Sequence, residues 1–234
     1  MYRNLVPVRI RVSAIVVLFS AGMAAAGPLE EANTAYSKGD YDAAVPLLRA
    51  LADEGDRSAQ FKLGVLYEEG KGVPKNYTEA IRWYCVASAQ GDTDAPFHVG
   101  RIYHDGRGMP RDQARALKWY RVGANRGEPK AQVNLAVSYA SGQGVLRNYA
   151  EAAKWFRIAA EHGDEIAQDN LGVLYLTGTG VRRDYVRAHM WFNLAAGQGD
   201  HDAIAKRDYV TRLMTPPDVE RAQKLAREWK KVEQ

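Results

Sequence analysis

A repeat of 36 residues is the feature that most constrains how this chain folds. A glycine-rich loop occurs four times along the sequence, and each copy begins 36 residues after the previous one. The copies are "EGKGVPKN" at 69–76, "DGRGMPRD" at 105–112, "SGQGVLRN" at 141–148 and "TGTGVRRD" at 177–184. A fixed period of this length is typical of a solenoid, in which each repeat is one structural unit stacked on the next. The predicted repeats are residues 57–92, 93–128, 129–164 and 165–200.

Each repeat carries two stretches with the apolar spacing of an amphipathic helix. In the first repeat the earlier stretch places its apolar residues at Ala59, Leu63, Leu66 and Tyr67. The later stretch places them at Tyr77, Ala80, Trp83, Tyr84 and Ala87. The repeat is therefore predicted to be a helical hairpin.

The glycine-rich loop has two interpretations, a phosphate-binding loop or a turn. Gly70 and Gly72 suit the positive φ at which a helix ends, and Asn76 is placed to cap the second helix. A phosphate site would need a cation, but Lys71 is replaced in the later repeats by Arg107, Gln143 and Thr179. The loop is therefore predicted to be a turn.

A tryptophan column runs through the repeats and has two interpretations as well. Its members are Trp83, Trp119, Trp155 and Trp191. Such a column could stack sugar rings, but large aromatic residues at a fixed helical phase also pack one hairpin against the next. We favour the second interpretation and expect these side chains in the core.

The flanking segments are imperfect copies of the repeat, as the ends of a solenoid are. Residues 27–56 are predicted to form an N-terminal capping hairpin with a shorter loop, and residues 201–234 a C-terminal one. In the latter, Thr215 is placed to cap a final helix that starts with two prolines. The predicted fold is all-α, a right-handed α-solenoid of about six helix-turn-helix units.

Residues 1–26 have the pattern of a cleavable signal peptide. Three arginines precede an apolar run from Val12 to Met23, and the small residues Ala24 to Ala26 follow. The apolar run is shorter than the ~20 residues that span a bilayer, so we expect cleavage near Ala26 rather than a membrane anchor. The expected location of the mature protein is the periplasm or the exterior, without stable membrane insertion.

The charge of the mature chain argues against a nucleic-acid partner. The whole sequence has 32 basic and 28 acidic residues, and three of the basic ones lie in the signal segment. Without that segment the balance is 29 to 28, or +1. Because phosphate neutralisation supplies most of the affinity for nucleic acids, we expect none as a ligand. Cys85 is the only cysteine, which excludes an intramolecular disulfide and a multi-cysteine metal site; no metal or cofactor is expected.

The repeat resembles the Sel-one-like repeat family, which is related to tetratricopeptide repeats. Residues 59–92 carry its Ala-x-x-x-Leu-Gly-x-x-Tyr helix, its Gly-x-Gly-Val loop and its Ala-x-x-Trp-Tyr helix. Ala136 departs from the pattern where the other repeats have glycine, and Leu146 and Arg182 replace loop prolines. The resemblance implies an adaptor that binds a protein or peptide, often in bacterial envelope signalling, secretion or host contact.

An enzyme is the alternative function. A cysteine-rich branch of the family is described as penicillin-binding with β-lactamase activity, but that branch closes each hairpin with a disulfide, which a single cysteine cannot form. No serine has a lysine three positions later, and no His-Glu-x-x-His motif occurs. We therefore expect a binding protein without catalytic residues.

The resemblance places ligands on the concave face, which first-helix positions line in tetratricopeptide-type solenoids. The candidate binding residues are Phe61, Lys62, Phe97, His98, Arg101, His104, Asp105, Lys130, Asn134 and Asn170. Val65, Glu68, Val133, Val137, Asp169 and Val173 map to the same face. Helical spacing places Arg101 near His98 and Asp105, where it could offer a planar cation to a ligand carboxylate.

The asparagines belong to a second part of this face. Asn134 and Asn170 have the same phase one repeat apart, so their amides could bind an extended peptide backbone. For any single residue of the concave set, the alternative is an ordinary solvated helix surface.

Overall fold

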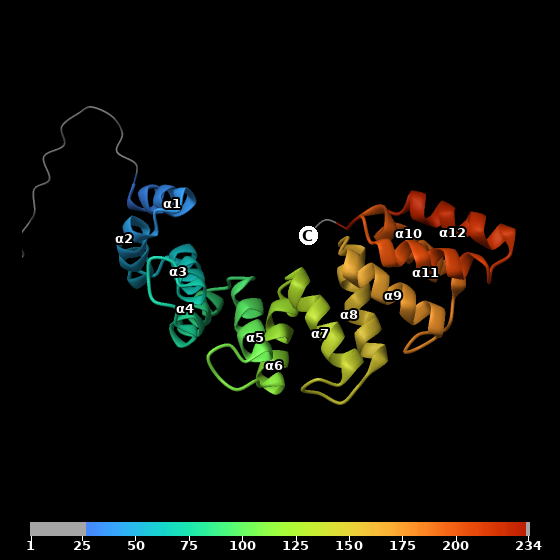
Figure 1. The fold of residues 1–234 in the computed structure, drawn as a ribbon, viewed down its shortest axis with the longest axis horizontal. Coiled ribbons are helices and arrows are strands. Elements are labelled where there is room, and N and C mark those ends of the chain that lie inside the picture. The colour runs from blue at the N-terminus through green and yellow to red at the C-terminus, as the bar shows by residue number, and fades with distance from the viewer. Residues whose placement is uncertain (1–26, 233–234) are drawn as a thin grey trace, which may run out of the picture.

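The computed structural model describes residues 27–232, and within this range the chain forms twelve α-helices and no strand. Their bounds are α1 Pro28–Lys38, α2 Tyr41–Asp53, α3 Arg57–Glu69, α4 Tyr77–Ala89, α5 Ala95–Asp105, α6 Gln113–Asn125, α7 Pro129–Ser141, α8 Tyr149–Glu161, α9 Glu165–Thr177, α10 Tyr185–Gly197, α11 His201–Thr211 and α12 Pro216–Glu228. The helices follow one another along an open arch (Figure 1). The all-α solenoid predicted from the repeat is therefore confirmed.

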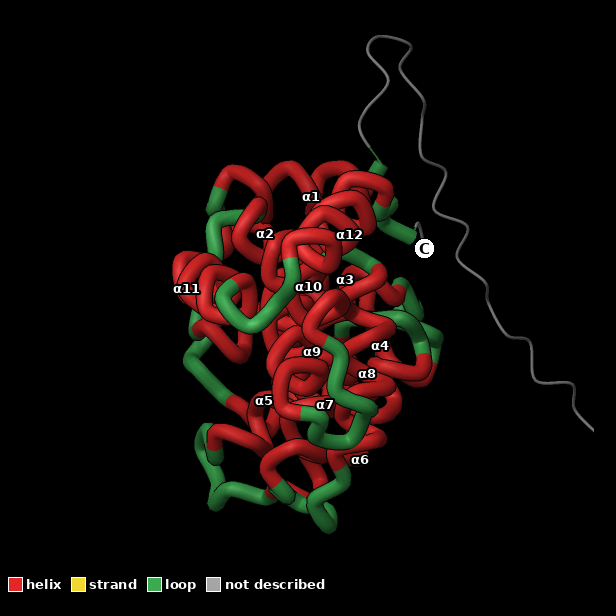
Figure 2. The backbone as a smooth tube through the Cα atoms, turned by 90° about the vertical axis from the view of Figure 1, so that its right-hand side faces the viewer, coloured by secondary structure: helices red, strands yellow, loops and turns green. Residues whose placement is uncertain are grey.

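The helices pack in chain order. The pairs α3–α4, α5–α6, α7–α8 and α9–α10 are the hairpins of the four repeats, and each second helix also packs against the next first helix. In the described part of the chain only short loops join the helices (Figure 2). No helix in residues 27–232 has the length and apolarity that crossing a membrane requires.

The glycine-rich loops end the first helix and start the second as predicted. Gly70 ends α3 with φ 74°, and its amide donates a hydrogen bond to Leu66 O. At the other side of the loop, the Asn76 side chain accepts hydrogen bonds from the amides of Thr78 and Glu79. Asp112, Asn148 and Asp184 cap the later second helices in the same way.

The second glycine of the loop is needed for a close contact between repeats. Gly144 has φ 72°, and a Cβ atom there would lie 2.4 Å from the backbone oxygen of Gln113. Gln113 is the first residue of α6 in the preceding repeat. The loop thus packs backbone to backbone on its neighbour, which explains why it carries glycine rather than a binding side chain.

A column of aromatic rings forms the centre of each hairpin. Tyr84, Tyr120, Phe156 and Phe192 are each at most 1% exposed. Small residues on the first helices make room for these rings: a Cβ atom at Gly100 would lie 2.6 Å from the Tyr120 ring. Gly64 and Gly172 face their rings in the same way.

The tryptophans line the core beside this column. Trp83 and Trp191 are buried, whereas Trp119 and Trp155 are half-buried and pack against core residues from outside. The predicted structural role of the tryptophans is confirmed, but the deepest aromatic residues are the ones that directly follow them.

The C-terminal end differs from the hairpin expected for 201–234. Thr215 caps α12 as predicted, but α12 packs mainly against α10 and makes few close contacts with α11. The apolar side of α10 has no further repeat to cover it, and the buried Ala222 and Ala226 of α12 fill that place. After α12 the chain returns to α8, where the Val232 amide donates to Glu161 O at 2.9 Å.

Candidate functional site

A buried carboxylate lies among the predicted binding residues. The Glu68 side chain at the end of α3 is 4% exposed and has partners at both oxygens. Its Oε2 accepts a hydrogen bond from Tyr84 Oη at 2.8 Å and lies 3.0 Å from His98 Nδ1. Its Oε1 accepts from Arg101 Nη2 at 2.6 Å and from Arg107 Nη1 at 3.1 Å. We refer to these five residues as the Glu68 cluster.

The surroundings of Glu68 keep it ionised. Burial raises the pKa of Glu68, but the hydrogen bonds from His98 and Tyr84 and the charge of Arg101 outweigh it and lower the pKa to about 2. The pKa of the Tyr84 hydroxyl moves the other way, upward, through burial and the adjacent carboxylate. Tyr84 therefore remains a hydrogen-bond donor, and Glu68 a fully occupied acceptor rather than a general base.

The Glu68 cluster joins two repeats. Glu68 and Tyr84 belong to α3 and α4 of the first repeat, whereas His98 and Arg101 lie on α5 and Arg107 in the loop that follows it. The positions equivalent to Glu68 in the later repeats are His104, Ala140 and Leu176, so the other repeats lack this carboxylate.

Aromatic rings surround the cluster. The His98 ring lies 5.3 Å from the Phe61 ring and 4.9 Å from the Tyr84 ring, measured between centroids. Phe97 lies 5.6 Å from His98 on another side. This packing fixes the orientation of His98, while Arg101 and Arg107 remain about one-third exposed.

The carboxylate of the Glu68 cluster is fully paired. Both of its oxygens have partners in the cluster. Within residues 27–232, no three His, Cys, Asp or Glu side chains gather as a metal site. Its surface can present the outer edges of two guanidinium groups to a carboxylate or a backbone carbonyl.

The structure changes the expected partners of Arg101. Helical spacing suggested that Arg101 and Asp105 share a neighbourhood, but Arg101 pairs with Glu68 across the repeat boundary. Asp105 instead pairs with Arg107 at 2.6 Å. Because the Glu68 side chain is only 4% exposed, its charge needs a partner within the protein, and Arg101 supplies one.

Phe97 and His104 expose less of their rings to a ligand than expected. Phe97 is only 9% exposed, because its ring packs on Tyr120 in the core. Lys130 lies above it, with its Nζ 5.8 Å from the ring centroid. The Nδ1 atom of His104 is buried without a partner, and its ring lies 6.3 Å from that of Tyr120.

The remaining candidates lie at either side of the Glu68 cluster. Lys62 bonds to Asn33 of α1 and stands over the Tyr36 ring. The side-chain amide nitrogens of Asn134 and Asn170 donate to carbonyls one turn back in their own helices, Lys130 O and Ile166 O, both at 2.8 Å. Each asparagine keeps its Oδ1 and a second N–H for a ligand.

Three other polar side chains have structural settings. His162 Nδ1 lies 2.8 Å from the carbonyl of Ile158, and His189 is buried, with its pKa lowered by burial and by nearby Arg207. Cys85 is half-buried, and burial raises the pKa of its thiol. A thiol in this state is a poor nucleophile at neutral pH.

Sequence reasoning missed Tyr84 and Arg107 as parts of the site and assigned Glu68 no partner. The sequence predicts Tyr84 as a core residue and Arg107 as a turn residue, and both predictions hold for the backbone. They leave out that the Tyr84 hydroxyl and the Arg107 guanidinium group both donate hydrogen bonds to Glu68. A usable signal exists in the repeat comparison. Arg101 stands where the other repeats have Val65, Val137 and Val173, and a new cation beside a new carboxylate at Glu68 indicates a pair.

Comparison with known proteins agrees with this architecture. The family model described as "Sel1 repeat" matches residues 57–92, 94–128, 129–164 and 166–200. A protective antigen of uropathogenic Escherichia coli with an SLR fold is 32% identical with a TM-score of 0.75; the match covers 87% of this chain but 45% of that protein. A Sel1 repeat protein from Oxalobacter formigenes is 27% identical with a TM-score of 0.70, over 88% of this chain and 89% of its own. A search among curated proteins gives no match.

Proposed function

Because the chain belongs to the Sel1 repeat family, whose members generally mediate protein interactions, we propose that it is an exported bacterial adaptor or regulator of the cell envelope. The proposed ligand is a protein or peptide held on the concave face by first-helix residues. The ligand needs no cofactor, and the protein acts by binding rather than by turnover.

The observation that carries this proposal is the Glu68 cluster. It immobilises His98 and Arg101 on rigid helices while leaving part of the Arg101 side chain exposed. Polar groups that are held in place before binding lose less entropy when a ligand arrives. The free Oδ1 atoms of Asn134 and Asn170 continue this polar row along α7 and α9. Such an open, polar row suits an extended peptide better than a small substrate, because it does not exclude water.

The test begins with affinity capture from envelope extract and identification of the retained protein. The binding constant is then measured for wild type and for Asn134→Ala with Asn170→Ala. We expect the double variant to bind more weakly by about 1–3 kcal/mol. Arg101 is left intact in this test because its replacement would also expose the charge of Glu68.

Lys118→Ala with Lys154→Ala is the control outside the concave face. These exposed side chains lie on the second helices α6 and α8. The control pair should leave binding unchanged. Equal affinity of the asparagine variant and wild type, at equal thermal stability, would move the binding site away from the concave face.

The absence of a catalytic role has its own test. Saturable hydrolysis of a β-lactam or of peptidoglycan by the purified protein would overturn the adaptor proposal. We expect none, because the chain has no Ser-x-x-Lys motif and the carboxylate of the Glu68 cluster is already occupied.

Export rests on the sequence alone, because residues 1–26 lie outside the described residues. We propose cleavage near Ala26, which leaves Gly27 or a close neighbour at the mature N-terminus. N-terminal sequencing of protein recovered from the envelope fraction tests this, and an intact Met1 would contradict it.

A further inference from the structure

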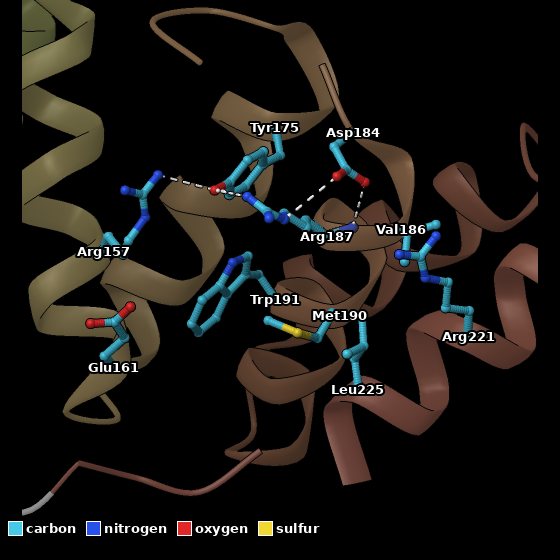
Figure 3. Close-up of a pocket in the computed structure, with 10 residues that line it drawn as sticks. All are labelled: Arg157, Glu161, Tyr175, Asp184, Val186, Arg187, Met190, Trp191, Arg221 and Leu225. Carbon is cyan, nitrogen blue, oxygen red and sulfur yellow. Dashed lines mark hydrogen bonds and ion pairs between the residues drawn. The ribbon is translucent and has the colours of Figure 1, made fainter. Parts of the chain in front are cut away.

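Several arginines surround a pocket between α8, α10 and α12. The pocket has a volume of about 540 Å³, and its walls include Arg157, Tyr175, Arg187, Trp191, Arg221 and Leu225 (Figure 3). A second pocket of about 570 Å³ shares Arg157 and Arg187 and adds Arg182 and Arg183 from the loop before α10. The two together form one surface, which we call the arginine pocket.

The arginine pocket has far more positive than negative charge. Five arginines line it, against the carboxylates Glu161 and Asp184. Of these arginines, only Arg187 has an ion pair in residues 27–232, with Asp184 at 3.5 Å. The sequence beyond residue 26 carries a net charge of only +1, so this excess is local.

Two of the five arginines have no counterpart in the earlier repeats. Arg182 takes the position of Pro74, Pro110 and Leu146. Arg221 belongs to α12, which follows the last repeat. The loop forms with proline or leucine in place of Arg182, so the turn itself gives no reason for arginine at that position.

Two of the arginines are held in place by a shared partner. Tyr175 Oη accepts hydrogen bonds from Arg157 Nη2 at 3.0 Å and from Arg187 Nη1 at 3.1 Å. Arg157 comes from α8 and Arg187 from α10, so this hydroxyl links the two helices. Both residues line the pocket, and Figure 3 shows their guanidinium groups meeting at the Tyr175 hydroxyl.

The pocket also has an apolar side. Figure 3 shows Arg157 and Arg221 at opposite sides of the pocket, with Trp191 and Met190 between them and Leu225 on α12 nearby. The Leu225 side chain is 37% exposed. An apolar group of a ligand can therefore be buried while charged groups on either side of it reach the arginines.

We infer that the arginine pocket binds an acidic peptide segment of a partner protein, with an apolar side chain against Trp191 and Leu225. Planar guanidinium groups match carboxylates in bidentate pairs, and separated arginines match carboxylates spread along a chain better than a single phosphate. This site goes beyond the proposed function, because its arginines lie on second helices, in the loop before α10 and on α12, not among the first-helix residues of the concave face.

The test is isothermal titration calorimetry of the purified protein with capped peptides. The first peptide has glutamates on both sides of a central leucine pair, the second has glutamine at each glutamate position, and the third has serine at each leucine position. We expect the first peptide to bind more tightly than the other two. Its affinity should fall with added salt, because part of the attraction is between exposed charges.

The variant Arg182→Gln with Arg221→Gln tests the pocket directly. Both side chains are exposed and have no hydrogen bond or ion pair in the described structure, so the fold should keep its thermal stability. We expect about tenfold weaker peptide binding, as for the loss of a charge-assisted contact. The control Arg57→Gln with Arg212→Gln removes the same charge from two exposed positions outside the pocket, and it should bind like wild type.

Several outcomes would overturn the inference. These outcomes are no binding of the first peptide, equally tight binding of the glutamine peptide, and an equal loss of affinity in both double variants. Inorganic phosphate or pyrophosphate that displaces the peptide at equal concentration would assign the pocket to a small anion, and tighter binding of a short single-stranded DNA would assign it to nucleic acid. Loss of peptide binding in Asn134→Ala with Asn170→Ala, but not in Arg182→Gln with Arg221→Gln, would return the peptide to the concave face.

Discussion

The carboxylate of Glu68 lies 2.6 Å from the guanidinium group of Arg101, although the two residues belong to different repeats. This contact connects α3 directly to α5, past the intervening helix α4. Asp169 and Lys206 make a similar contact at 2.5 Å between α9 and α11. Polar links between first helices thus add to the apolar packing that joins neighbouring hairpins, and they set the relative orientation of the side chains on the concave face.

Glu68→Gln should destabilise the protein at neutral pH. The change keeps the size of the side chain but removes the charge that faces two arginines, and we expect a loss of about 2 kcal/mol in the free energy of unfolding. Urea titration measures it. Asp105→Asn is the control, because its pair with Arg107 is about one-third exposed and should contribute under ~1 kcal/mol. An equal loss in the free energy of unfolding in both variants would show that the buried ion pair of Glu68 contributes no more than the exposed pair of Asp105.

The pH dependence of stability should change with the same variant. The pKa of Glu68 is about 2 in the folded protein and 4.5 ordinarily, so the folded state favours the ionised form. This stabilisation is fully present above pH 4.5, amounts to about 3 kcal/mol, and is lost as the pH falls toward 2. Between pH 6 and pH 2 the free energy of unfolding should therefore fall less steeply with decreasing pH for Glu68→Gln than for wild type. An identical pH dependence of the two proteins would contradict the lowered pKa.

Gly100→Ala should be among the more damaging single-methyl additions. The new Cβ atom would lie 2.6 Å from the Tyr120 ring, which is fully buried and has no space to move. We expect a net loss of about 1–3 kcal/mol despite the better helix propensity of alanine. The natural counterpart is Ala136, which faces Phe156 in the third repeat, and Ala136→Gly should lose only about 1 kcal/mol. A stabilising Gly100→Ala would show that the rings tolerate a shift.

These cases mark what the repeat pattern predicts and what it leaves open. The period, the helix caps and the glycine turns follow from local chemistry, so the sequence predicts them at the level of single residues such as Asn76 and Gly70. The Glu68 pair joins positions 33 residues apart, and its geometry depends on how two hairpins are stacked. Local spacing suggested Asp105 as the neighbour of Arg101 because it contains no information on that stacking.

The C-terminal end shows a similar limit. The sequence predicts the cap at Thr215 and the helix that follows it. The sequence does not predict that this helix packs on α10, because the packing depends on which apolar surface remains uncovered at the end of the solenoid. Arg221 of this helix lines the arginine pocket. The repeat pattern therefore could not predict the pocket, because it does not predict where α12 packs.

Gly144→Ala should test the role of the loop as a contact between repeats. Alanine there would have φ 72° and a Cβ atom 2.4 Å from the backbone oxygen of Gln113, so we expect a loss of about 2–4 kcal/mol. Gly91→Ala is the matched control, with φ 89° but no atom within 4 Å of the new Cβ. It should lose only about 1 kcal/mol from backbone strain. Similar losses of stability at both positions, measured by thermal unfolding, would show that the positive φ alone, and not the contact with Gln113, requires glycine at position 144.

Cys85→Arg should stabilise the protein. In three other units an arginine donates to a tyrosine hydroxyl 18 residues later: Arg49 to Tyr67, Arg121 to Tyr139 at 2.9 Å and Arg157 to Tyr175 at 3.0 Å. Cys85 occupies the equivalent position before Tyr103, whose hydroxyl accepts no such bond in the described structure. We expect a gain of about 0.5–1 kcal/mol in the free energy of unfolding when the missing donor is introduced.

A double-mutant cycle with Tyr103→Phe separates this bond from other effects of the new side chain. The gain from Cys85→Arg should disappear when the Tyr103 hydroxyl is absent, because the guanidinium group then has no acceptor. Cys85→Met adds an apolar side chain without a hydrogen-bond donor. Its effect on the free energy of unfolding should therefore be the same with Tyr103 and with Phe at position 103. If Cys85→Arg stabilises the Tyr103→Phe background to the same extent, the gain comes from burial of the arginine stem, and the recurring arginine–tyrosine contact has no measurable weight in joining the repeats.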